Sequence, residues 1–101
     1  MIVYNVSNKV HPEFESEWVR WQKEEHIPDI MSSGMFSEYK FFRLLDQDET
    51  DGVTYIIQYF APDIEHYQQY VENFAPPLRK KAMDRWGNKF IAFRTIMQVV
   101  N

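Results

Sequence analysis

VTYIIQYF, at residues 53–60, carries the strongest strand signal in this chain, because β-branched and aromatic side chains fit a pleated surface. Both alternating sets of its side chains are apolar: Tyr55, Ile57 and Tyr59 in one set, Ile56 and Phe60 in the other. A second aromatic run at residues 36–45 precedes it, and the polar segment 46–52 between them has the composition of a turn. The two runs therefore predict an antiparallel hairpin.

One interrupted helical segment is predicted on each side of this hairpin. The first begins near Pro12 and is interrupted at Pro28, because proline cannot donate the hydrogen bond that a helix interior needs. The second begins after the N-cap Asp63 and is interrupted at the pair Pro76-Pro77. Apolar residues at helical spacing mark the buried faces: Phe14, Trp18 and Trp21 in the first segment, and Ile64, Tyr67, Val71 and Phe74 in the second.

Strands are also predicted at the two ends of the sequence, at residues 1–7 and 90–100. The resulting order is β-α-β-β-α-β, the split βαβ or ferredoxin-like pattern. Right-handed crossovers place two kinked helices on one face of a four-stranded antiparallel sheet. We therefore expect an α+β fold, a single ferredoxin-like domain over residues 1–101, since this length suits one compact domain.

The second face of the predicted sheet should be polar if the protein is a monomer. Instead, the strands have two apolar faces. In the last strand, one set is expected to face the helices: Ile91, Phe93, Met97 and Val99. The alternate positions are also apolar: Phe90, Ala92 and Ile96. The simplest cover is the same face of a second copy, so we expect a homodimer formed through sheet faces.

Composition excludes several classes of protein. Hydrophobic residues make up 45% of the chain, and the absence of cysteine excludes disulfides and thiol nucleophiles. Residues 76–101 hold six Lys/Arg against one Asp/Glu, but the net charge of −4 would repel a polyanion, so no nucleic-acid partner is expected. No run approaches the ~18 apolar residues of a membrane span, and no leader precedes the first strand, so a cytoplasmic protein without membrane contact is expected.

The segment WVRWQKEEHIP, residues 18–28, contains the main catalytic candidate, His26. A histidine titrates near neutrality and can act as a general base, with Trp18 and Trp21 as an aromatic wall beside it. The alternative is a purely structural histidine that caps the last carbonyls of a helix ending before Pro28. Both interpretations stay open at this point.

A polar group is predicted on the sheet face opposite the helices. If the apolar residues of the first strand face the helices, Asn5 faces away, and by the same alternation Gln58 and Arg94 join it. These three side chains either satisfy one another and the partner chain, or form a clamp for an anion or a carbonyl.

Other charged residues indicate structural roles. Glu25 lies one turn past Trp21, and we expect it to form a salt bridge with a basic residue, for example Arg79 or Arg85 of the second helical segment. No metal site is predicted, because the three histidines are widely spaced and no His-x-x-x-His motif occurs. The turn at 46–52 has its glycine at the seventh position, not the sixth that a calcium loop requires.

Several motifs resemble those of an uncharacterised family of small bacterial proteins that carries only a domain-of-unknown-function label. They are Ile2-Val3-Tyr4-Asn5-Val6, Glu24-Glu25-His26-Ile27-Pro28, Gly34, Gln58-Tyr59 and Phe93-Arg94-Thr95. The similarity runs nearly end to end. The family resembles the dimeric α/β-barrel class, in which two ferredoxin-like units join their sheets. That class includes cofactor-free monooxygenases, muconolactone-isomerase-like enzymes and haem-binding chlorite dismutases, so the resemblance implies a fold and a dimer, not one function.

Three functions remain open. The first is a homodimer, without cofactor or metal, that binds a small apolar or aromatic molecule. Its candidate ligand-binding residues are Trp18, Trp21, Asn5, Gln58 and Arg94. The second is a cofactor-independent monooxygenase or isomerase with His26 as general base, and the third is a structural or regulatory dimer without ligand. A cavity of several hundred Å³ touching His26 or Arg94 would favour a ligand.

Overall fold

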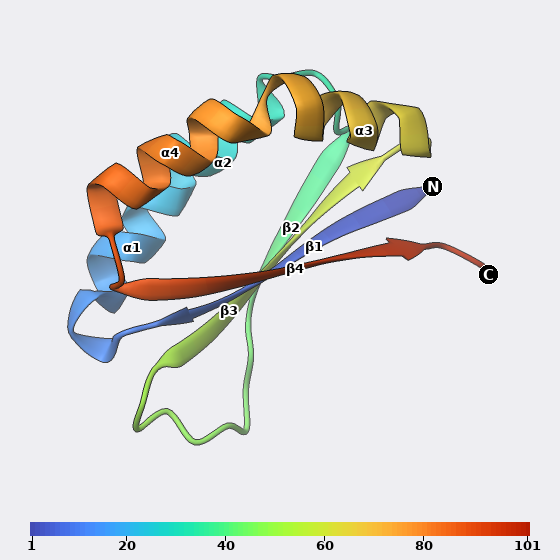
Figure 1. The fold of residues 1–101 in the computed structure, drawn as a ribbon. Helices are drawn as coiled ribbons and strands as arrows, with labels where there is room; N and C mark the ends of the chain where they lie inside the picture. Colours follow the sequence, from blue (N-terminus) through green and yellow to red (C-terminus); the bar gives the residue numbers. More distant parts are fainter.

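The computed structural model describes residues 1–101, folded into one sheet and one layer of helices (Figure 1). The strands are β1 (Ile2–Val10), β2 (Glu38–Arg43), β3 (Val53–Ala61) and β4 (Phe90–Gln98). The helical elements are the 3₁₀ turn η1 (Pro12–Phe14), α1 (Glu15–Trp21), the π-helical segment η2 (Gln22–His26), α2 (Ile27–Met31), α3 (Ile64–Asn73) and α4 (Ala75–Trp86).

The sheet has the strand order β2-β3-β1-β4, and every pair of neighbours is antiparallel. All the helices lie on one side of it, and the β2–β3 loop extends past its end (Figure 1). This arrangement confirms the predicted α+β, ferredoxin-like fold. Boundaries differ modestly: β1 continues to Val10 because residues 8–10 also pair with β3 and β4.

The first helical segment does not bend sharply at Pro28 but widens just before it. The backbone N–H of Ile27 donates to the carbonyl of Gln22, which closes a π-helical turn, and the helix then continues to Met31. In a regular α-helix the ring of Pro28 would clash with the carbonyl of Glu24, and the wider turn accommodates it. The second segment breaks as predicted, at Phe74, with two prolines in the first turn of α4.

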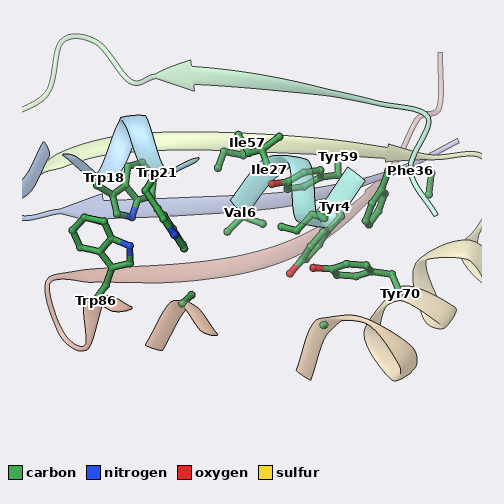
Figure 2. Packing of buried hydrophobic residues seen from close by; sticks show 14 of the residues in the cluster. Tyr4, Val6, Trp18, Trp21, Ile27, Phe36, Ile57, Tyr59, Tyr70 and Trp86 are labelled. Carbon is green, nitrogen blue, oxygen red and sulfur yellow. The ribbon is translucent and has the colours of Figure 1, made fainter. Parts of the chain in front are cut away.

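The core between helices and sheet consists of two aromatic groups (Figure 2). At one end lie the indoles Trp18, Trp21 and Trp86. At the other end lie Tyr4, Phe36, Tyr59 and Tyr70. Within each group, rings meet edge to face. The ring centroids of Trp21 and Trp86 are 5.7 Å apart, and those of Phe36 and Tyr70 are 4.9 Å apart. Burial of each large side chain contributes about 1.5–3 kcal/mol to the free energy of unfolding.

The facing predicted for the last strand was wrong. Val6 faces the helices and lies opposite Arg94 of β4, so Arg94 also lies on the helix side of the sheet. The residues expected to face the helices face away from them instead: Ile91, Phe93 and Met97. Alternation alone cannot assign faces when both sets are apolar, and only the register with β1 decides between them.

The sheet face opposite the helices, here called the outer face, carries both apolar and polar side chains. Its apolar side chains are Val3, Phe42, Ile56, Phe60, Ile91, Phe93 and Met97. Phe93 is 64% exposed and Ile91 56% exposed, and no other element of the chain covers this side (Figure 1). At its centre Gln58 Nε2 donates to Asn5 Oδ1 at 3.3 Å. A polar row of Lys40, Gln58, Asn5 and Thr95 crosses the sheet between two apolar rows. Exposed large apolar side chains such as Phe93 and Ile91 are common at interaction sites.

Candidate functional site

His26 lies at the end of the π-helical segment and stacks on Trp21. Their ring centroids are 4.5 Å apart and the ring planes differ by 17°. Residues five apart point about 140° away from each other on an α-helix, so the π turn is what brings these two rings onto one face. Trp21 is thus the aromatic wall behind the imidazole, whereas Trp18 is fully buried against Phe41, Tyr55 and Phe90.

Glu25 forms a salt bridge with a basic residue of α4. Its carboxylate lies 3.1 Å from Nζ of Lys81, which also bonds Asp29 at 3.0 Å. The predicted salt bridge to a basic residue of the second helical segment is therefore present, with Lys81 of α4 in place of the examples Arg79 and Arg85. The prediction also assumed regular helical spacing after Trp21, whereas the extra residue of the π turn gives the buried position to His26 and leaves Glu25 exposed.

The imidazole of His26 is neutral at ordinary pH. Burial lowers its pKa from 6.5 to about 4; nearby Asp29 opposes this effect, and Arg94 and Lys81 add to it. The side chain makes no capping hydrogen bond, and the helix continues past it to Met31. The structure therefore does not support the capping interpretation and leaves a half-buried neutral base beside the sheet.

A narrow space, here called the inner cavity, separates the helices from the sheet in front of His26. Its volume is about 30 Å³, room for one or two water molecules. Polar groups from several elements line it: Asn8, Gln22, His26, Tyr59, Arg79 and Arg94. Most of the remaining lining is apolar and comes from the sheet and α4. A space this small admits water or a single polar substituent.

Two buried polar atoms next to this cavity have no hydrogen-bond partner: Oε1 of Gln22 and the hydroxyl of Tyr59. Gln22 is 2% exposed and Tyr59 is 1% exposed, so bulk water does not satisfy them. An unpaired buried polar group costs about 1–3 kcal/mol. Burial also raises the pKa of Tyr59 well above its usual value, so the hydroxyl stays protonated and can donate.

Two other polar groups of the inner cavity, Asn8 and Arg79, make hydrogen bonds, whereas His26 and Arg94 make none. Asn8 Nδ2 donates to the carbonyls of Val6 and Tyr55, at 3.2 and 3.3 Å. Nη2 of Arg79 donates to the hydroxyl of Tyr4 at 3.3 Å. The unpaired atoms of Gln22 and Tyr59 therefore sit within a partly hydrogen-bonded polar lining.

A larger space, here called the outer groove, lies between α4 and β4 and measures about 500 Å³. Its lining residues are Arg79, Ala82, Met83, Gly87, Asn88, Phe90, Ile91, Ala92 and Arg94. Five of them also line the inner cavity: Arg79, Ala82, Phe90, Ala92 and Arg94. The two spaces therefore adjoin along the β4 side of the sheet and share these five residues as a common wall.

The structure separates the predicted ligand-binding residues into three places. Arg94 lines both spaces, and Trp21 supports His26 from behind. Trp18 belongs to the core, and Asn5 and Gln58 lie on the outer face, so the predicted grouping of Arg94 with those two was wrong. The β4 register explains the error, as described above.

Sequence reasoning missed three groups of the site: Gln22, Tyr59 and Arg79 as lining residues. A signal existed for Gln22, which follows Trp18 by four residues and therefore shares its buried helical face. Tyr59 was assigned correctly to an apolar strand set, but its unpaired hydroxyl depends on tertiary packing.

No group of three or more His, Cys, Asp or Glu side chains converges as a metal site would. No helix has the length and apolarity needed to cross a membrane.

Comparison with known families places the chain in a class and then in a family. The fold is ferredoxin-like, as the solved structures below indicate. Residues 1–100 match the model of the domain of unknown function DUF4286, so the chain belongs to this family. No curated protein matches the sequence.

Solved structures share the fold at low sequence identity. An ethyl tert-butyl ether D (EthD) family protein from Bacillus halodurans C-125 is 18% identical, with a TM-score of 0.72 over 99% of this chain and 100% of that one. SnoaB, a cofactor-independent oxygenase from Streptomyces nogalater, is 14% identical, with a TM-score of 0.67 over 99% and 93%. A dimeric ferredoxin-like protein from an uncultured marine organism is 9% identical, with a TM-score of 0.68 over 99% and 94%. At these identities the likeness concerns the fold alone.

Proposed function

We propose that this protein is a homodimer in which each subunit binds a small apolar or aromatic molecule in the outer groove. The observation that carries the proposal is the groove itself, at about 500 Å³ and within the ~300–1,000 Å³ range of small-molecule sites. Five of its nine lining residues are hydrophobic, and the unpaired polar atoms of Gln22 and Tyr59 lie at the adjoining inner cavity. Small-molecule sites typically combine a hydrophobic lining with a few polar groups.

The homodimer is supported by the exposed apolar side chains of the outer face. A second copy placed sheet to sheet would cover Phe93 and Ile91, which are otherwise exposed. It would also enclose the hydrogen-bonded pair of Asn5 and Gln58 at the centre of the contact. One of the structurally similar proteins is described as dimeric, which agrees with this use of the fold.

Ligand binding can be tested by titrating the protein with 2-naphthol, a neutral aromatic probe, and following amide chemical shifts by two-dimensional NMR. We expect shifts confined to α4, β4 and the residues around His26. Ala92→Trp fills the groove and should abolish them, with Ala82→Phe as a second blocking variant if the first folds poorly. Gln69→Trp, at an exposed position on α3, is the control and should bind normally. Binding that survives both blocking variants would refute this site.

A second candidate function is a cofactor-independent monooxygenase or isomerase with His26 as general base. The observation in its favour is a neutral imidazole at the adjoining inner cavity, able to accept a proton from an acidic phenol or carbon. One structurally similar protein is a cofactor-independent oxygenase. Oxygen uptake with dithranol as substrate would test it. His26→Gln should abolish turnover while NMR binding persists, and unchanged turnover would exclude this role for His26.

A further inference from the structure

We infer that the outer groove selects organic anions: planar aromatic molecules whose anionic oxygen is bound jointly by Arg79 and Arg94. This inference rests on the proposed function and adds the chemical class of the ligand. Arg79 projects from α4 and Arg94 from β4, and both side chains line the outer groove and the inner cavity. The two guanidinium groups thus come from the two elements that form the walls of the groove.

The groove lacks the carboxylates that would neutralise these two arginines. The chain contains 15 Asp and Glu residues, yet none of them lines the outer groove or the inner cavity. Neither Arg79 nor Arg94 forms a salt bridge, whereas Arg43, Lys80 and Lys81 all do. Arg79 makes one hydrogen bond, to the neutral hydroxyl of Tyr4, and Arg94 makes none. In a protein of net charge −4, the groove is therefore a local positive site.

Both guanidinium groups influence the same two tyrosines, Tyr67 and Tyr70, which lie outside the outer groove. Both lower the pKa of Tyr67 and of Tyr70, against the larger effect of burial that raises it, so both lie close to the same pair of phenols. Arg94 also lowers the pKa of His26. Guanidinium groups bind carboxylate and phenolate oxygens through paired, charge-assisted hydrogen bonds. Two of them at one groove favour a negatively charged oxygen over a neutral one.

The lining of the groove and of the inner cavity indicates the ring and the second polar group of the ligand. Ala82 and Ala92 contribute small apolar side chains to the lining and Phe90 contributes an aromatic ring, a combination that suits a flat ring. The adjoining inner cavity, at about 30 Å³, is too small for a ring but large enough for one hydroxyl. There Gln22 Oε1 can accept and the Tyr59 hydroxyl can donate, since both lack partners. The matching class is an aromatic carboxylate or phenolate with a second hydroxyl group.

Calorimetric titration with 6-hydroxy-2-naphthoate and with its neutral primary amide tests the inference. We expect the carboxylate to bind at least about tenfold more tightly than the amide, because charge-assisted contacts exceed neutral ones. Arg94→Gln and Arg79→Gln should each weaken carboxylate binding by about tenfold and change amide binding by less than about twofold. Arg20→Gln removes an exposed arginine of α1 that lines neither space and should change neither affinity.

The possible outcomes separate this inference from the proposed function. Equal affinities for carboxylate and amide, unaffected by Arg94→Gln, would overturn the anion preference and leave a groove that binds neutral aromatics. Failure of both compounds to bind the folded wild-type protein would overturn the inference together with groove binding of this class.

A third ligand tests the role of the inner cavity. We expect 2-naphthoate to bind several-fold more weakly than 6-hydroxy-2-naphthoate, and Gln22→Leu should remove that difference in affinity. A difference that persists in Gln22→Leu would show that Gln22 does not accept from the hydroxyl.

Discussion

At the scale of single residues, His26 and the two unpaired atoms beside it distinguish this chain from a protein that is only a packed core. The imidazole stacks on Trp21 and stays neutral because burial lowers its pKa to about 4. Gln22 and Tyr59 keep unsatisfied polar atoms at the same cavity. Folded proteins rarely keep such groups without a use for them, because each one costs free energy of folding.

The lowered pKa of His26 predicts a pH dependence of stability. Between pH 6.5 and about 4 the unfolded chain binds a proton at this imidazole and the folded protein does not, so the free energy of unfolding falls as pH falls through this window. The expected loss is about 2–3 kcal/mol at the lower end.

Urea denaturation of wild type and His26→Gln at several pH values measures this effect. The difference in stability between the two proteins should change across the window and level off below about pH 4. His11→Gln, a change at an exposed site, controls for the loss of a histidine. A constant difference between wild type and His26→Gln from pH 7 to pH 4 would contradict the buried neutral state.

The unpaired hydroxyl of Tyr59 predicts an unusual response to a small substitution. Tyr59→Phe removes a buried group without a partner, so stability should stay unchanged or rise by up to about 1 kcal/mol. Tyr55→Phe is the matched comparison, because that hydroxyl donates to Glu15 at 2.5 Å, and it should lose about 1 kcal/mol. Thermal denaturation decides: a Tyr59→Phe loss as large as that of Tyr55→Phe would mean that the hydroxyl has a partner.

At the scale of elements, the π-helical segment η2 connects sequence to site. Its extra residue accommodates Pro28 and moves His26, rather than Glu25, onto the buried face. Strands, helices and the break at Pro76 and Pro77 could be predicted, because β-branched runs, helical spacing and proline act locally. The π turn could not, since a regular period of 3.6 residues was assumed throughout.

The facing of β4 illustrates a second limit of sequence reasoning. Both alternate sets on this strand contain apolar residues, so burial preference does not choose between them, and pairing with β1 places Arg94 rather than Phe93 beneath the helices. The candidate site could therefore be predicted in part: His26 and Arg94 were named, but Arg94 was placed on the wrong side. The cavity itself depends on how α4 packs over β4, which no local pattern specifies.

The π turn predicts an unequal tolerance to deletion. With Pro28→Ala as the common background, so that no proline ring clashes with a regular helix, removing the exposed residue Glu24 would set Trp21 and His26 four apart, the α-helical spacing for one face. The free energy of unfolding should then fall by less than about 1–2 kcal/mol. Removing Lys80 from α4 would instead rotate Ala82 and Trp86 by about 100° out of the core. Thermal denaturation of the two deletions compares them, and equal damage would contradict the assignment of the extra residue to η2.

At the scale of the whole molecule, the sheet separates two apolar environments. On the helix side, the aromatic core and the outer groove share the face that carries Arg94. On the outer face, seven apolar side chains surround the hydrogen-bonded pair of Asn5 and Gln58. The proposed protein uses the first face for a ligand and the second for another copy of itself. Except at Ile91, which lies on the outer face and also lines the outer groove, changes to one face should therefore leave the property of the other intact.

The outer face also determines which substitutions test the dimer. Phe93→Asp introduces a charge at a 64% exposed site on this face, and a dimer should dissociate because a carboxylate would be buried without a partner. Met83→Asp is the matched control, since Met83 is also 64% exposed but lies on α4. This variant should keep the wild-type assembly.

Sedimentation equilibrium at micromolar concentration tests the account most directly. It predicts a wild-type mass of two 12.3 kDa chains, the mass of one chain for folded Phe93→Asp, and two chains for Met83→Asp. A wild-type protein that sediments as one folded chain, with its outer face in water, would contradict the account.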